Sequence, residues 1–204
     1  MQIEKKKSSR PQWFSAIRFV LVCVGPSGWK KAFKCENLIM QFQAQLVIQK
    51  IRRQVVIKQS RSDIAQLLQN DNIDSAFARL SYLHIDTCVL AAYDLIDNFC
   101  ECIISNISCI SKFSCIHNLP TKVAVAVASL TYASSRCGEL SLLHLIRNLF
   151  RERYGRDFDI TNVELFAGNY VNLELRKNLS IYSVSDDEKL MLLHGIIQEY
   201  TSPL

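Results

Sequence analysis

The sequence predicts an all-α fold, and three observations lead to this prediction. No Gly or Pro occurs in the 91 residues from Trp29 to Leu119, whereas β-sandwich, barrel and Rossmann folds need such residues in turns about every ten residues. Apolar residues recur at helical spacing through most of this stretch. The composition of 49% apolar and 21% charged residues is that of a folded globular chain of 204 residues.

The first two predicted helices are long and form an antiparallel hairpin. They cover residues 31–69 and 73–110, and the polar segment QNDN at 69–72 reads as a tight turn. At 1.5 Å per residue, each helix would be on the order of 50–60 Å long. Two apolar stripes on the first helix predict burial between neighbours on two sides. They consist of Met40, Ala44, Val47, Ile51 and Val55, and of Phe42, Leu46, Ile57, Ile64 and Leu68.

Three shorter helices follow with recognisable starts or ends. A third helix is predicted for residues 120–134, because Pro120 suits a first helical turn. A fourth is predicted for 139–154, with Gly155 as the residue that ends it. Residues 157–182 are expected to be irregular, apart from a short helix near 161–166. The segment SDDE at 185–188 is a capping box, which predicts a final helix beginning at Ser185.

Residues 1–32 are expected to form a disordered or weakly structured N-terminal extension, which leaves residues 33–200 as one helical domain. Four basic residues precede an apolar run at 13–24, as in a signal peptide, but Arg18 interrupts this run. The run is too short to cross a bilayer. A shallow interfacial anchor is the alternative reading of the segment.

The charge is distributed unevenly along the chain. Residues 1–61 contain 13 Lys or Arg and two acids, whereas residues 62–204 contain 11 Lys or Arg and 17 acids. On the first helix, Lys50, Arg53, Lys58 and Arg61 fall within an arc of roughly 140° at 100° per residue. We call these four residues the basic ridge. The ridge is expected to contact an anionic membrane, nucleic acid or a neighbour's acidic surface, and a solvated helix face is the alternative.

No arrangement of residues indicates catalysis or a bound cofactor. The eight cysteines lie in apolar periodic segments without a C-x-x-C pair, so we expect free thiols in a cytoplasmic protein and no metal site. The segment GPSGWK at 25–30 lacks the spacing of a phosphate-binding loop. No Ser–His–Asp or Cys–His set is indicated by the sequence. The sequence therefore predicts neither an enzyme nor a small-molecule substrate.

A series of motifs in a fixed order resembles the ESCRT-III-related family of regulators of the vacuolar-sorting AAA ATPase in the multivesicular-body pathway, which has an increased-sodium-tolerance-type domain. The matching segments are FKC at 33–35, RSDIAQLL at 61–68, LIDNFCE at 95–101, ASLTYASSRC at 128–137 and YGRDF at 154–158. The segment ELFAGNY at 164–170 is most similar to the corresponding segment of plant members of this family. Departures include Ser81 in place of an acidic residue and SLL at 141–143 in place of a Pro-Glu-Leu segment.

This resemblance implies an elongated ESCRT-III-like bundle, with the shorter helices packed at the open end of the hairpin. It implies a non-enzymatic adaptor that binds ESCRT-III subunits, modulates the ATPase in protein sorting and acts peripherally at endosomal membranes. Self-assembly into polymers is a further implied property. The sequence ends at Leu204, so the family's ATPase-docking tail is expected to be absent and direct docking is not expected.

The final helix is a candidate docking helix through Leu190, Leu193 and Ile197. The alternative is that this apolar face packs on the bundle itself. The alternative function for the whole chain is a basic helical hairpin that binds anionic membrane or nucleic acid without an ESCRT role. Affinity that falls steeply with salt would distinguish this second class.

Overall fold

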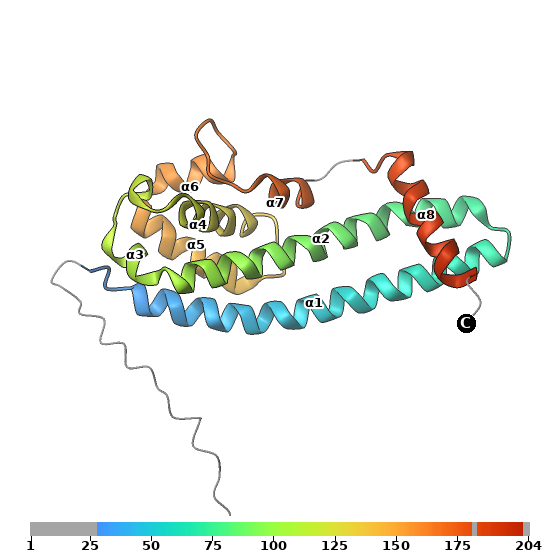
Figure 1. The fold of residues 1–204 in the computed structure, drawn as a ribbon, viewed down its shortest axis with the longest axis horizontal. Coiled ribbons are helices and arrows are strands. Elements are labelled where there is room, and N and C mark those ends of the chain that lie inside the picture. Colours follow the sequence, from blue (N-terminus) through green and yellow to red (C-terminus); the bar gives the residue numbers. More distant parts are fainter. Residues whose placement is uncertain (1–27, 181–182, 202–204) are drawn as a thin grey trace, which may run out of the picture.

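The computed structural model describes residues 28–180 and 183–201, and a long helical hairpin forms the frame of this part of the chain (Figure 1). The hairpin consists of α1 (Ala32–Gln69) and α2 (Ile73–Ser105), which run antiparallel along the long axis of the molecule. Every regular element in the described ranges is helical. The predicted all-α class, the bounds of the first helix and the start of the second are confirmed.

The turn between the two long helices lies at the predicted polar segment. The side chain of Asn72 accepts a hydrogen bond of 3.4 Å from the backbone N–H of Ser75 and thereby caps α2. Asp71 has a φ of 55°, in the left-handed region that Asp and Asn tolerate better than most residues. Polar residues with these conformational preferences therefore close the hairpin.

Helix α2 ends five residues earlier than the predicted end at Ile110. A separate helix, α3 (Ile107–Lys112), follows after a break at Asn106. The side-chain amide of Asn106 donates a 2.7 Å hydrogen bond to the carbonyl oxygen of Cys102, and its backbone N–H bonds the oxygen of Ile103 at 3.1 Å. Asparagine offers the backbone such alternatives to the helical ladder. The break turns the chain so that α3 contacts α1.

Four short helices gather at the open end of the hairpin, as predicted (Figure 1). After α3 and a short 3-10 helix, η1 (Ile116–Asn118), come α4 (Thr121–Ala133), α5 (Ser141–Tyr154) and α6 (Arg156–Val163). Ten of the 13 residues of α4 are buried, which fits a helix that is apolar around most of its circumference. Helix α4 contacts α2, α5 and α6 and lies at the centre of this group.

The segment expected to be irregular contains two helices instead. Gly155, with a φ of 95°, ends α5 and is directly followed by α6. The short helix predicted for 161–166 therefore begins at Arg156 instead. Asp157 and Asp159 lie in its first turn, where acidic side chains stabilise a helix. Further along, α7 (Leu173–Asn178) is capped by Asn172, whose side chain accepts a 2.9 Å hydrogen bond from the N–H of Leu175.

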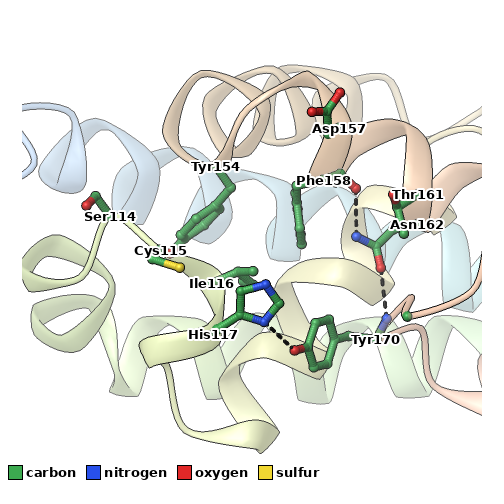
Figure 2. A pocket seen from close by; sticks show the side chains of 11 residues that line it. Ser114, Cys115, Ile116, His117, Tyr154, Asp157, Phe158, Thr161, Asn162 and Tyr170 are labelled. Carbon is green, nitrogen blue, oxygen red and sulfur yellow. Dashed lines mark hydrogen bonds between the residues drawn. The ribbon is translucent and has the colours of Figure 1, made fainter.

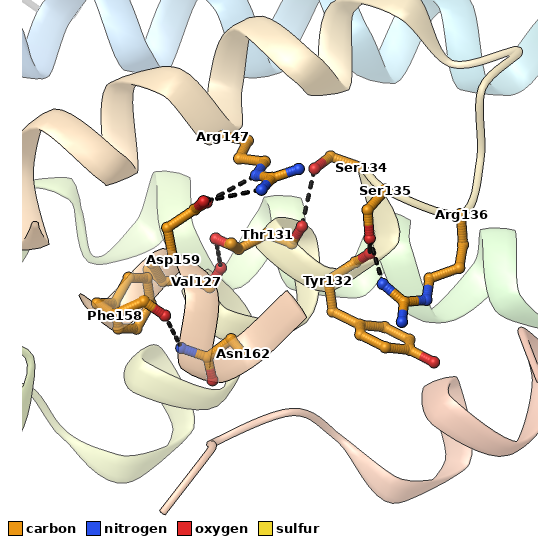
Figure 3. Close-up of polar contacts among 10 residues, drawn as sticks. All are labelled: Val127, Thr131, Tyr132, Ser134, Ser135, Arg136, Arg147, Phe158, Asp159 and Asn162. Atoms are coloured by element: carbon orange, nitrogen blue, oxygen red, sulfur yellow. Dashed lines mark hydrogen bonds and ion pairs between the residues drawn. The ribbon is translucent and has the colours of Figure 1, made fainter. Parts of the chain in front are cut away.

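A buried ion pair joins α5 to α6 (Figure 3). The guanidinium of Arg147 donates hydrogen bonds of 2.6 and 2.8 Å to the two carboxylate oxygens of Asp159, which is only 3% exposed. Hydrogen bonding to Asp159 raises the pKa of Arg147 despite the opposing effect of burial. Since both charges are satisfied by two parallel bonds, the pair fixes the relative orientation of the two helices.

Helix α8 (Asp186–Thr201) packs at the closed end of the hairpin, beside the turn, and not with the other short helices (Figure 1). Its predicted capping box is confirmed. The backbone N–H of Glu188 donates to Ser185 Oγ at 3.3 Å, and the Glu188 carboxylate accepts from the N–H of Ser185 at 3.0 Å. The apolar core is accordingly divided into a large cluster at the open end and a small cluster at the closed end.

The expected N-terminal extension falls mostly outside the described residues, because the description begins at residue 28. Within residues 28–31, the backbone N–H of Trp29 donates to Ser111 Oγ at 3.0 Å. Lys31 forms an ion pair with Glu152, and the guanidinium of Arg153 lies 5.6 Å from the centre of the Trp29 ring. Trp29 and Lys31 therefore contact the helical domain.

Candidate interaction surfaces

The basic ridge lies on α1 on the side that turns toward acidic residues of the same molecule. Lys50 Nζ is 2.6 Å from a carboxylate oxygen of Asp94 and 3.5 Å from one of Asp97, both on α2. The hydrogen bond to Asp94 is the main cause that raises the pKa of Lys50 above its ordinary value. Lys50 is therefore held in its charged form as a link between the two helices of the hairpin.

Arg53 links α1 to two other parts of the molecule. Its guanidinium lies 2.5 Å from Asp86 on α2 and 3.7 Å from Glu139, which precedes α5. The hydroxyl of Tyr93 also donates to Glu139, and burial together with this hydrogen bond raises the pKa of Tyr93. A half-buried polar network therefore surrounds Arg53 where the middle of the hairpin meets the shorter helices.

The remaining two ridge residues differ from each other. Arg61 donates hydrogen bonds of 2.9 and 2.5 Å from Nε and Nη2 to Glu199 on α8. Lys58 is exposed, and no ion pair joins it to another residue in the described ranges. Three of the four ridge cations thus have carboxylate partners within the molecule, as attraction between the basic first part of the chain and its acidic remainder would produce.

The candidate docking helix, α8, is packed on the hairpin through part of its apolar face. Ile196 is fully buried in the closed-end cluster, and Leu193 is partly buried against it. Leu190 and Ile197 remain 44% and 40% exposed. The buried members of this cluster on the hairpin are Ile64, Ala65, Ala76, Leu80 and Leu83. The helix therefore has an inner face that contacts the hairpin and an outer face that is partly exposed.

One of the two apolar stripes predicted to be buried on α1 is instead exposed. Phe42, Leu46 and Ile64 of the second stripe are fully buried. The first stripe, by contrast, faces away from α2. Its exposed members are Met40 (49%), Val47 (50%), Ile51 (54%) and Val55 (63%), and Ala44 is exposed as well. The prediction failed because helical periodicity shows which side chains share a face but not whether another element covers that face.

A cavity of about 400 Å³ near the open end lies between residues 114–117 and α6 (Figure 2). Three of its polar side chains take part in hydrogen bonds around the cavity. A ring nitrogen of His117 lies 2.8 Å from the hydroxyl of Tyr170. The side chain of Asn162 donates to the oxygen of Phe158 at 2.7 Å and accepts from the N–H of Tyr170 at 2.9 Å. These bonds shape the loop after α6, whereas the buried hydroxyl of Tyr154, which also lines the cavity, has no hydrogen-bond partner within the described residues.

A cysteine–histidine contact that the sequence did not indicate occurs on α2. Cys88 Sγ lies 3.4 Å from His84 Nε2, and Glu188 Oε1 lies 4.0 Å from the same nitrogen. In a catalytic triad, the nucleophile and the acid contact different nitrogens of the imidazole. The geometry therefore differs from that of a cysteine hydrolase.

The described residues show neither the features of a metal site nor those of a membrane-spanning helix. The described residues contain no group of three or more His, Cys, Asp or Glu side chains that could hold a metal ion. None of the helices in the described ranges combines the length and the hydropathy needed to pass through a bilayer. The seven cysteines in this part of the chain are free thiols. Burial raises the pKa of Cys35 and of Cys137 to about 12.

Comparison with known proteins connects this architecture to a family. A family model described as "Ist1: Regulator of Vps4 activity in the MVB pathway" matches residues 37–203, from α1 to the end of α8. The IST1-like protein of Dictyostelium discoideum is 22% identical over 162 residues, which represent 79% of this chain and 42% of that protein. The chain thus spans less than half the length of this curated relative.

A solved structure has the same fold. The N-terminal domain of S. cerevisiae Ist1, crystallised in complex with the Did2 MIM motif, matches with a TM-score of 0.77 and 20% sequence identity. The match covers 85% of this chain and 94% of that domain. The resemblance inferred from the sequence motifs is thereby confirmed, along with the ESCRT-III-like fold. Neither relative comes from a plant, so the plant-like character remains a prediction.

Proposed function

Because the chain belongs to the Ist1 family of regulators of Vps4 activity in the MVB pathway, we propose that it is a non-enzymatic adaptor of the ESCRT-III system. In this role it binds ESCRT-III subunits and, through them, modulates the disassembly of ESCRT-III by Vps4 during protein sorting into multivesicular bodies. The observation that carries the proposal is the match of the family model to all of the domain from α1 to α8.

The proposed partner is a short helical motif of an ESCRT-III subunit. The related yeast domain was crystallised with the Did2 MIM motif, and a bundle of packed helices offers grooves that accept an amphipathic helix. The arrangement of polar groups supports a binding role in preference to catalysis. His84 lacks the geometry of a catalytic triad, because Cys88 and Glu188 contact the same ring nitrogen.

We propose the outer face of α8 as one contact surface for such a partner. Leu190 and Ile197 are partly exposed on this face, and a cavity of about 190 Å³ lies between α8 and α1, lined in part by Leu68, Ile197 and Tyr200. Leu193 contributes to the inner face instead. A helix of the partner that buries Leu190 and Ile197 would leave α8 in its place on the hairpin.

Within the basic ridge, Lys58 is the main residue that we propose to contact an acidic partner or membrane surface. An acidic partner or membrane surface can reach Lys50, Arg53 and Arg61 only in competition with the carboxylates that already contact them. Lys58 is exposed and can form a new ion pair without losing one. The site of action that follows from this role is the cytoplasmic surface of endosomes, where the protein would be peripheral.

Retention of purified ESCRT-III subunits on the immobilised chain tests the proposal. We expect at least one subunit to be retained, and we expect the double variant Leu190→Asp/Ile197→Asp to retain less of it. The matched control is Leu173→Asp, because Leu173 is 77% exposed and lies on α7, away from this surface. Retention of no subunit by the unaltered chain would contradict the adaptor role.

A further inference from the structure

The far side of α1 carries a continuous apolar stripe that no other part of the described chain covers. At 100° per residue, its members lie within an arc of roughly 100°, opposite the positions of Phe42 and Leu46 that face the core. The stripe consists of Met40, Ala44, Val47, Ile48, Ile51 and Val55. Their large side chains are 49–63% exposed. Single exposed apolar residues are ordinary, but a contiguous patch indicates an interaction surface.

The spacing of this stripe is symmetric about the point between Val47 and Ile48. If a second α1 helix lies antiparallel with a two-fold axis at that point, Met40 faces Val55 of the other copy and Ala44 faces Ile51. Val47 then faces Ile48. Steps of four, three and four residues from Met40 to Ile51 are those of a helix–helix seam. We propose that two copies of this chain pair through the stripe in this antiparallel register.

The side chains beside the stripe are compatible with the same register. The two-fold axis brings residues on the same edge of the stripe together, so Gln41 of one copy lies near Arg52 of the other, and Gln43 lies near Gln54. Lys58 lies opposite Asn37. No cation within the length of the stripe therefore meets a cation of the other copy, and neutral amides can hydrogen-bond across the seam. Two-fold pairing of one surface with itself is also the commonest arrangement of protein dimers.

The size of the stripe predicts a weak and concentration-dependent pair. Half-exposed Val, Ile and Met side chains over about four helical turns would bury on the order of 1,000 Å² in total, near the lower limit for specific interfaces. A membrane is the less fitting occupant. Interfacial helices combine an apolar face with a polar face rich in Lys and Arg, whereas the face of α1 opposite the stripe is packed against α2.

Sedimentation equilibrium of the purified chain tests the pairing, and its outcome is independent of the proposed function because no ESCRT-III subunit is present. As the concentration rises from low to high micromolar, we expect the mass to rise from that of one chain toward twice that value. Val47→Lys and Ile51→Lys should each keep the chain monomeric. The matched control is Val56→Lys, since Val56 is 47% exposed on α1 but lies outside the stripe, and this variant should associate like the unaltered chain.

A charge exchange tests the register. Ala44→Glu should prevent association, as should Ile51→Lys, but the double variant Ala44→Glu/Ile51→Lys should regain it because each Glu faces a Lys of the other copy. The double variant Met40→Glu/Ile51→Lys should stay monomeric, since residue 40 faces residue 55. Circular dichroism would show that each variant keeps its helices.

Three results would overturn the inference. A chain that remains monomeric at every concentration has no such interface. Equal association of both double variants, or of neither, contradicts the antiparallel register. If Val47→Lys lowers the binding of vesicles of anionic phospholipid but leaves the mass of the chain in solution unchanged, then a membrane occupies the stripe.

Discussion

Arg61 of α1 donates hydrogen bonds from both Nε and Nη2 to one carboxylate oxygen of Glu199 on α8, at 2.9 and 2.5 Å. This contact joins residues that are 138 positions apart in the sequence. It lies at the closed end of the hairpin, close to the buried side chain of Ile196. An arginine expected to face a partner therefore contributes to holding the last helix on the domain.

Loss of this ion pair should loosen α8 selectively. We expect Glu199→Gln to speed hydrogen exchange of the α8 amides, because the helix loses a charged link to α1. The pair is partly exposed, so the expected cost is about 0.5–1 kcal/mol. Hydrogen exchange followed by mass spectrometry measures the effect. Asp187→Asn is the control, since Asp187 is exposed on α8 and forms no ion pair within the described residues. Equal exchange in the two variants would show that Arg61 does not hold the helix.

Two adjacent isoleucines of α8 should differ in their contribution to stability. Ile196 is fully buried and Ile197 is 40% exposed. Truncation of a fully buried Ile costs about 2–5 kcal/mol, so Ile196→Ala should release α8 from the hairpin. Ile197→Ala should change stability by less than about 1 kcal/mol. Urea unfolding monitored by circular dichroism compares them, and similar midpoints would refute the observed packing of α8.

The start of α8 should depend on pH through Glu188. Hydrogen bonds from the backbone and the side chain of Ser185 lower the pKa of Glu188, with a smaller effect from His84 on α2. A carboxyl group with a lowered pKa in the folded state stabilises that state above its unfolded pKa, and this contribution is lost as the pH falls through the folded pKa. We therefore expect exchange of the first α8 amides to accelerate in acid.

Glu188→Gln provides the control for this pH dependence. It keeps a hydrogen-bonding side chain at the third position of the capping box but cannot titrate. The variant should show faster exchange than the unaltered chain at neutral pH and a smaller change on acidification. The same acid response in both proteins would place the titrating group elsewhere.

Charge reversal should distinguish the ridge cations that form ion pairs within the molecule from Lys58, which is exposed. Arg53→Glu would place a third acid beside Asp86 and Glu139, and breaking such a half-buried network should cost roughly 2–4 kcal/mol. Lys58→Glu should change stability by less than about 0.5 kcal/mol. Urea unfolding measures both effects. Comparable losses of stability would mean that the paired and the exposed cation have similar roles.

Lys58→Glu is consequently the variant with which contact between the ridge and an anionic surface can be measured. If the ridge contributes to such a surface, the variant should bind vesicles of anionic phospholipid several-fold more weakly at low salt. The difference should disappear at high salt. Unchanged binding would remove Lys58 from the proposed contact surface.

The cysteines should differ strongly in their rates of alkylation. Burial raises the pKa of Cys35 to about 12, so little thiolate is present near pH 8 and the side chain is also shielded. Cys115 is exposed. Since the thiolate is the reactive form, iodoacetamide should label Cys115 rapidly and Cys35 only when the protein unfolds. Peptide mass spectrometry distinguishes the two sites, and early labelling of Cys35 would contradict its burial in the core at the open end.

Much of the fold was predictable because the strongest signals are local. The polar segment before Ile73 ends one long helix and begins the next, and the capping box at Ser185 starts α8 as expected. The break at Asn106 was missed because a single Asn inside an apolar periodic run is only a weak stop signal. Gly155 was predicted only to end the fourth helix. In the structure it also allows α6 to begin at the next residue.

The surfaces were less predictable because they depend on contacts between distant segments. Apolar residues at helical spacing, such as Val47 and Ile51 on α1, form the same sequence pattern whether or not another helix covers them. Similarly, the sequence places Lys50 and Arg53 on one arc but does not reveal that Asp94 and Asp86 lie opposite them. Which residues pair across the hairpin depends on the register of α1 against α2. The turn at Asp71 sets this register, and it becomes apparent only in the three-dimensional structure.

The disassembly rate of preformed ESCRT-III polymers by Vps4, measured with and without the purified chain, tests the adaptor role most directly. The account predicts that the chain changes this rate in a dose-dependent way, and that the ATP hydrolysis rate of Vps4 alone, without ESCRT-III subunits, stays the same. An unchanged disassembly rate at saturating amounts of the chain would contradict it.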